Sequence, residues 1–129
     1  MRLDPIADAL SAIRNAEMVG KDTVYITPVS KLLKNVLKIL KDHGYIEDYE
    51  YIENYRGGIT KVKLRGKIHN IGVIKPRFPV KWREIEMWER KYLPSYTMGL
   101  LIISTPKGVM THEEAKKQKI GGRLIAYVY

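Results

Sequence analysis

The spacing of apolar residues predicts two helices in the first half of the chain. The first begins at Asp4-Pro5, because a carboxylate suits the N-cap and proline suits the first helical position, and it ends at Gly20. The second is capped by Ser30 and ends at Gly44. At about 100° per residue, its apolar side chains share one face. The opposite face carries Lys31, Lys34, Lys38 and Lys41.

Three strands are predicted around these helices. Residues 23–27 are β-branched or aromatic, and residues 45–52 and 59–64 form a hairpin joined by turn residues. The first half therefore has the order α-β-α-β-β, with helices layered on a small sheet. Four acidic residues lie close together in the hairpin, which is more typical of a solvated face than of acid–base chemistry or a metal site. They are Glu47, Asp48, Glu50 and Glu53.

The second half is predicted to be mostly strand, with short helices. Strands are expected at 68–74, 99–103 and 123–129. The segment 75–79 is expected to be extended, because two prolines within it bracket an aromatic residue. A helix at 81–92 carries an aromatic stripe that is typical of core packing, with Tyr92 its most accessible member. A last helix begins at a capping pattern, Thr111 followed by Glu114, and ends at Gly121-Gly122.

These elements predict an α+β protein with two small domains, residues 1–65 and 66–129. The boundary is placed at Arg65-Gly66-Lys67. Units of about 65 residues are marginal alone, so the two domains are expected to pack tightly against each other.

The charge of the chain suggests a polyanionic partner. Among 129 residues there are 23 Lys+Arg and 14 Asp+Glu, and the excess of basic residues lies after residue 65. Nucleic acid is the commonest intracellular polyanion, although charge alone favours a merely soluble basic surface almost equally. There is no apolar run long enough to span a bilayer, so no membrane partner is expected.

The residue inventory argues against an enzyme. Without cysteine, disulfides, thiolate catalysis and cysteine-type zinc sites are excluded. Neither a P-loop nor a dinucleotide-binding glycine motif is present, so no cofactor is expected. His112 begins a helix like that of zinc proteases, but Lys116 stands where the second metal ligand is needed.

A candidate binding tip lies at Ser104–Gly108, after the apolar strand. Two hydroxyl groups at the end of a rigid strand can match base edges and ribose 2′-hydroxyls. Lys107 can contact a phosphate, and Gly108 permits a close backbone approach. Composition alone favours a plain strand terminator at this point.

The sequence contains, in order along the chain, several further motifs besides this binding tip. Asp4-Pro5-Ile6-Ala7-Asp8, Arg14-Asn15-Ala16, Ser30-Lys31-Leu32, Ser104 to Thr111 and Gly121-Gly122 together resemble the eighth small-subunit ribosomal protein family over essentially the whole chain. Three further segments resemble the archaeal and eukaryotic branch of that family. They are Arg77 to Val80, Lys91 to Pro94 and Ala126 to Tyr129.

The resemblance implies a cytoplasmic, ribosome-bound protein without catalytic activity. Such proteins bind an irregular helix in the central domain of small-subunit ribosomal RNA, assist early assembly and meet neighbouring small-subunit proteins. Their base-reading Ser-Thr-x-x-Gly element falls on Ser104, Thr105 and Gly108. Bacterial relatives have a hydroxyl where this chain has Pro106, so that contact is not carried over. They commonly have Glu at the position of Arg123, whose phosphate role is an inference of ours.

The expected RNA-binding residues fall into three groups. Ser104 and Thr105 are expected to discriminate the irregular RNA surface. Phosphates are expected to meet Arg14, Lys31, Lys75, Arg77, Lys107 and Arg123. The remaining predicted contacts are Asn15, Ser30, Tyr92, Gly108, Gly121 and Gly122.

Two other functions stay open. A DNA-binding module would need a recognition helix in the major groove, and DNA is not the expected partner. A protein–protein adaptor would use the acidic hairpin around residues 47–53, a role that is compatible with RNA binding.

Overall fold

The chain divides into two compact units, Met1–His69 and Asn70–Tyr129. A computed structural model describes residues 5–27, 30–53, 58–95 and 98–129. The predicted boundary after residue 65 lies just before this division and stays a prediction, as does tight association of the two parts. None of the helices in the described ranges is both long and apolar enough to cross a membrane.

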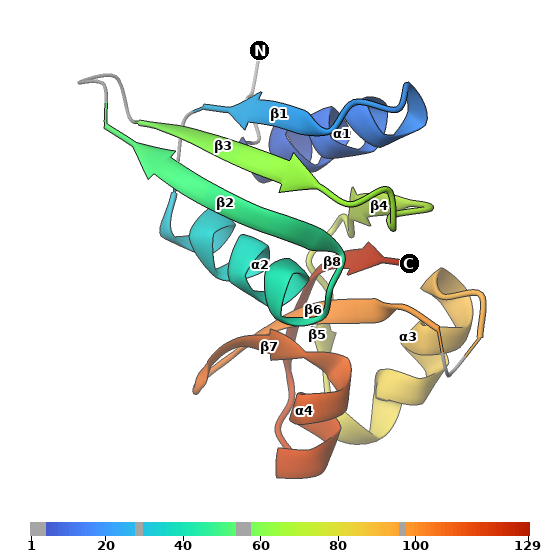
Figure 1. Cartoon of the computed structure of the whole chain (residues 1–129). Coiled ribbons are helices and arrows are strands. Elements are labelled where there is room, and N and C mark those ends of the chain that lie inside the picture. The colour runs from blue at the N-terminus through green and yellow to red at the C-terminus, as the bar shows by residue number, and fades with distance from the viewer. Residues whose placement is uncertain (1–4, 28–29, 54–57, 96–97) are drawn as a thin grey trace. The chain divides into compact units, whose positions relative to one another are not determined.

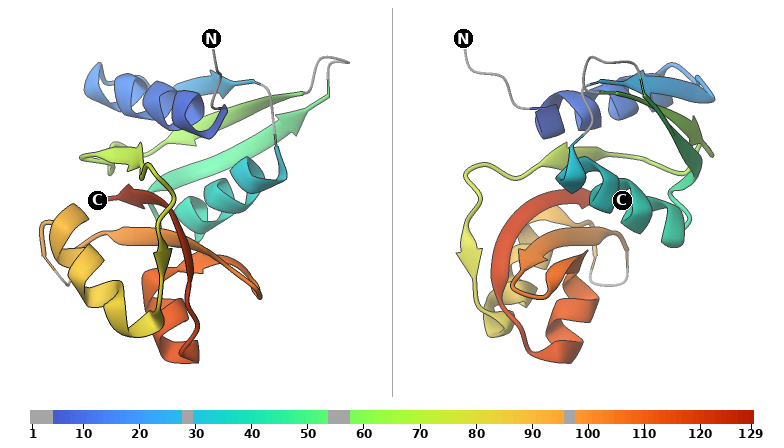
Figure 2. Two further views of the ribbon diagram at one scale, coloured as in Figure 1. Left: turned by 180° about the vertical axis from the view of Figure 1, so that it is seen from behind. Right: turned by 90° about the vertical axis from the view of Figure 1, so that its left-hand side faces the viewer.

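The first unit is an antiparallel sheet with helices on one face (Figure 1 and Figure 2). Its helices are α1 (Pro5–Met18) and α2 (Lys31–Asp42). Its strands, in the spatial order β1-β3-β2, are β1 (Thr23–Ile26), β2 (Ile46–Ile52) and β3 (Ile59–Leu64). The predicted order α-β-α-β-β is confirmed.

Local sequence signals explain these elements. The apolar face of α2 is buried, with Val36, Leu37 and Leu40 at 0% exposure. Ser30 caps α2 as predicted, because its Oγ accepts a 3.1 Å hydrogen bond from the backbone N–H of Leu33. The predicted cap Asp4 and the turn at residues 54–57 lie outside the described residues.

The second unit combines a second antiparallel sheet with short helices. Its helical elements are η1 (Trp82–Glu84), α3 (Ile85–Tyr92) and α4 (His112–Gln118). Four strands pair in the order β4-β8-β6-β7, and β5 also pairs with β8. Their bounds are β4 (Ile71–Val73), β5 (Pro79–Val80), β6 (Leu100–Thr105), β7 (Gly108–Thr111) and β8 (Gly122–Val128). The predicted α+β class is confirmed.

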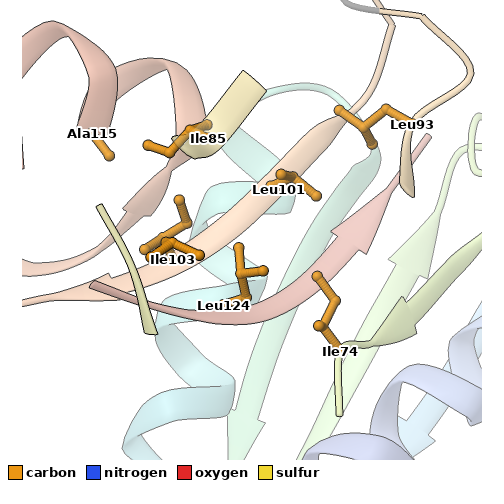
Figure 3. Packing of buried hydrophobic residues seen from close by; sticks show 8 residues of the cluster. Ile74, Ile85, Leu93, Leu101, Ile103, Ala115 and Leu124 are labelled. Carbon is orange, nitrogen blue, oxygen red and sulfur yellow. The ribbon is translucent and has the colours of Figure 1, made fainter. Parts of the chain in front are cut away.

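The core of the second unit lies where both helices meet the central strands (Figure 3). Ile85 of α3 and Ala115 of α4 converge there on Leu101 and Ile103 of β6 and on Leu124 of β8. β6 is buried on both faces, because Leu100 to Ile103 are at most 5% exposed, so the strand is anchored in the core up to the turn that follows it.

Three details of the second half differ from the prediction. The strand predicted at 99–103 continues through Thr105 and turns into β7, an unpredicted strand that is too short to show a period. The strand predicted at 68–74 is shorter, since only Ile71–Val73 pairs with β8. The last helix ends not at Gly121-Gly122 but at Lys119, which adopts the left-handed conformation with φ 56°.

Candidate nucleic-acid interface

The turn between β6 and β7 is held by the side chain of Thr105. Its Oγ1 donates a 2.8 Å hydrogen bond to the carbonyl oxygen of Gly108 and accepts one of 3.1 Å from the backbone N–H of Lys107. Gly108 has φ 116°, a conformation that favours glycine, and a side chain there would meet open space. Thr105 is only 9% exposed, so its hydroxyl serves the turn.

Ser104 stands on the opposite face of β6 from the core. Ile103 points into the core, so its neighbour Ser104 must project from the other face. Ser104 pairs with Val109 of β7 and with Arg123 of β8. It is half-buried, and within the described ranges its hydroxyl makes no hydrogen bond to the protein. This hydroxyl is therefore available to an external donor or acceptor.

An exposed arginine lies beside Ser104. Arg123 is paired in register with Ser104 on one side and with Pro79 on the other. Its Nη1 donates a 3.3 Å hydrogen bond to the carbonyl oxygen of Arg77, so the two basic residues are held together. Lys75 is exposed in the segment that leads to Arg77. The structure thus sets Ser104 beside Arg123, and Arg123 beside the backbone of Arg77, so that a neutral hydroxyl and basic residues share one region, as phosphate and base contacts require.

Gly121 and Gly122 act in this region through close packing. A Cβ atom on Gly122 would lie 2.1 Å from the carbonyl oxygen of Ser104, and one on Gly121 would lie 2.4 Å from that of Val80. Only glycine therefore lets β8 approach β6 and β5 at these positions. The pair positions Arg123 next to Ser104, a role that needs no direct contact with RNA.

Tyr92 does not join this group. Its ring stacks on Trp88 at 6.2 Å and on Tyr127 at 5.5 Å, in a row of rings on the core face of the sheet. Phe78 and Tyr129 extend the row at its two ends. The aromatic stripe is thus mainly a packing element, as the sequence suggested, and Tyr92 is half-buried within it.

The first unit carries the other predicted contacts. On α1, Arg14 is half-buried and Asn15 is exposed, and Asn15 lines a groove of about 500 Å³ together with Ala12, Val19 and Tyr25. On α2, the Ser30 hydroxyl is used in capping, whereas Lys31 is exposed.

The lysines of α2 are not equivalent. Lys41 lies 3.0 Å from the carboxylate of Asp48, and this hydrogen-bonded pair raises the pKa of Lys41 and lowers that of Asp48. Lys34 stands over the ring of Tyr51 at 4.2 Å. Lys31 makes no ion pair with any described residue. Lys38 makes none either, so Lys31 is distinguished by its place at the end of α2 nearest Ser30.

A buried polar network was not predicted. His112 is 0% exposed, and its Nδ1 accepts a 3.0 Å hydrogen bond from the backbone N–H of Leu101. Its Nε2 lies 2.9 Å from Glu89, in a contact that is not aligned as a hydrogen bond, and Lys116 donates to the same carboxylate. Burial lowers the pKa of His112. His112 and Lys116 thus hold α4 against α3. The two residues are one helical turn apart, and this spacing was the signal in the sequence from which a shared contact could have been predicted.

Comparison with known proteins gives a match over almost the entire sequence. The model of the family described as ribosomal protein S8 matches residues 4–129. The matched range includes all the predicted contact residues of both units.

Proposed function

Because the chain belongs to the ribosomal protein S8 family, and is thus a small-subunit ribosomal protein that binds ribosomal RNA, we propose that it binds the central domain of that RNA and assists its assembly. The family is structural and not enzymatic. The Ser104 hydroxyl beside Arg123 is the observation that carries the proposal, since it offers base readout and phosphate binding together.

The roles of the two hydroxyl residues differ in this proposal. Ser104 contacts the irregular RNA surface directly, because its hydroxyl has no partner among the described residues. Thr105 shapes the turn that presents Ser104 and Lys107, because its own hydroxyl is engaged there. Arg77, Arg123, Lys107 and Lys75 then anchor phosphates around the reading point.

Contacts from the first unit are part of the same proposal. Lys31 and Arg14 neutralise further phosphates, and Asn15 supplies a polar contact from α1. The exposed acidic residues of β2 repel phosphates, so this strand is better suited to neighbouring small-subunit proteins.

We assign the chain to the archaeal and eukaryotic type. The three segments on which this rests supply most of the stacked row of rings, including Phe78, Tyr92, Tyr127 and Tyr129. The three segments therefore pack against one another, which supports treating them together as one signature of the archaeal and eukaryotic type.

The test is the affinity of Ser104→Ala for a central-domain RNA fragment, with matched duplex DNA as competitor. Loss of the base-facing hydroxyl should weaken specific binding by roughly 1–3 kcal/mol, by analogy with mismatch costs. Ser11→Ala, the same change at an exposed position of α1, is the matched control and should bind like the parent. Unchanged RNA affinity of Ser104→Ala, or equal binding of the DNA, would refute the proposed reading role.

A further inference from the structure

Two cations lie over the ring of Trp82, at a corner of the second unit. The guanidinium carbon of Arg83 is 5.2 Å from the ring centroid, and the ammonium of Lys119 is 5.9 Å from it. Arg83 belongs to η1, and Lys119 follows α4, which packs against η1 (Figure 1 and Figure 2). Trp82 is half-buried and packs partly against the core, so only part of its ring serves packing.

The backbone at Lys119 points to a use for its side chain. Lys119 ends α4 with φ 56° and ψ 46°, in the left-handed region where glycine is the ordinary choice. A lysine there is less favourable for the backbone than glycine would be. The conformation nevertheless leaves its ammonium over Trp82. Residues held in sparsely populated backbone regions occur preferentially at functional sites.

A strip of positive charge connects this corner to the turn at Ser104. The pairing of β5 with β8 sets Arg123 opposite Pro79. The close approach of Gly121 to Val80 keeps the two neighbouring segments of backbone side by side beyond that pair. The cations along the strip are exposed, and they form no ion pair with a described residue. They are Arg77, Lys81, Arg83, Lys119 and Arg123.

An acidic group lies within this strip and is already engaged. The carboxylate of Glu84 accepts a 2.9 Å hydrogen bond from the backbone N–H of Lys81, at the start of η1. It therefore serves the local turn and, among the described residues, forms no ion pair with the ammonium and guanidinium groups of the strip. Unpaired cations beside an aromatic ring are suited to RNA, because phosphates meet the charges while an unpaired base stacks on the ring.

We propose that Trp82, Arg83 and Lys119 form a second RNA contact, which holds a segment adjoining the one that Ser104 contacts. The cations bind its phosphates, and an unpaired base stacks on the indole ring. This inference rests on the proposed function, since the strip is the path between the two contacts.

The decisive variant is Lys119→Gly, because it separates RNA binding from folding. Glycine is favoured at this backbone conformation, so the melting temperature should stay the same or rise. Removing one phosphate contact should reduce the slope of log affinity against log salt by about 0.9 for a duplex RNA, with the coefficient taken from DNA. The probe is a central-domain RNA fragment, titrated into the intact chain at several salt concentrations.

Two further variants control for charge alone. Lys117→Gln removes one positive charge two residues earlier, within α4, where the lysine does not lie over Trp82, so the salt slope of this variant should change less. Lys119→Arg keeps the charge and should bind like the parent. An unchanged slope for Lys119→Gly, or an equal decrease for Lys117→Gln, overturns the inference.

The fluorescence of Trp82 gives an independent readout. The chain has two tryptophans, so Trp88→Phe leaves Trp82 as its single reporter. Bound RNA should quench this fluorescence and shield the indole from acrylamide, and full accessibility to acrylamide in the saturated complex would contradict stacking. If Ser104→Ala binds the RNA like the parent while Lys119→Gly binds it more weakly, only the reading role of Ser104 is refuted. The reverse result would refute only the second contact.

Discussion

The hydroxyl of Thr105 and the carbonyl oxygen of Gly108 are joined by a 2.8 Å hydrogen bond across the turn between β6 and β7. The same hydroxyl accepts from the backbone N–H of Lys107, so one side chain fixes both arms of the turn. Ser104, its neighbour, projects from the other face and makes no such bond among the described residues. Two adjacent hydroxyl residues thus have separate tasks.

Thr105→Val should therefore weaken both folding and RNA binding. The substitution keeps the shape of the side chain but leaves the Gly108 carbonyl and the Lys107 amide without their partner, at a cost of about 1 kcal/mol in unfolding free energy. Urea denaturation measures this loss, and RNA affinity should fall because the turn is looser. Thr105→Ser retains the hydroxyl and should recover most of both. A Thr105→Val protein with parental stability would show that these bonds do not hold the turn.

The features that sequence reasoning recovered are local ones. The caps at Ser30 and Thr111 were predictable, because each Oγ accepts from an amide three residues further on. Only half of the predicted capping box forms at Thr111, since the Glu114 carboxylate instead accepts a 2.7 Å bond from Gln118. The amphipathic face of α2 was predictable from its period alone.

The features that were missed depend on distant pairing. The strand β7 exists because β6 lies beside it, and four residues alone do not show this. Glu89 and Lys116 meet across 27 positions of sequence. The task of Thr105 depends on the pairing of β6 with β7, which brings Gly108 within reach of its hydroxyl. The resemblance to a family singled out Ser104, whereas the pairing that sets Ser104 beside Arg123 of β8 could not be predicted from either segment alone.

The stability of the chain should depend on His112 below neutral pH. Burial holds the pKa of His112 in the folded chain below its ordinary value of 6.5, so the unfolded chain binds the proton more readily. The stabilising contribution is complete above pH 6.5 and decreases as the pH falls toward the lowered pKa. The slope should not exceed about 1.4 kcal/mol per pH unit.

Denaturant unfolding at a series of pH values measures this dependence. His112→Asn keeps an acceptor for the Leu101 amide but does not titrate, so its unfolding free energy should change less between pH 7 and pH 5. His69→Asn alters an exposed histidine and should behave like the parent. If His112→Asn retains the parental slope, the dependence arises elsewhere.

The lysines of α2 should contribute unequally to RNA binding. Lys31 is exposed at the N-terminal end of the helix, where free amides and the dipole also favour an anion. Lys41 is at the other end and is already paired with Asp48 at 3.0 Å. Lys31→Gln should therefore lower the log–log salt slope by about 0.9, taking the duplex DNA coefficient, and Lys41→Gln should lower it less. Equal slopes for the two variants would mean that α2 acts only through its total charge.

Gly122→Ala should disrupt the placement of Arg123 beside Ser104. The added Cβ would lie 2.1 Å from the Ser104 carbonyl oxygen, and because that atom belongs to a buried strand, β6 and β8 must separate locally. Overpacking of this kind costs about 1–3 kcal/mol, so the melting temperature should fall and specific RNA affinity should fall with it. Gly66→Ala is the control, since a Cβ there meets open space and only its φ of 72° is unfavourable. It should leave RNA affinity unchanged. If Gly122→Ala instead keeps its stability and loses only affinity, Gly122 itself contacts the RNA, and the packing role argued for it is wrong.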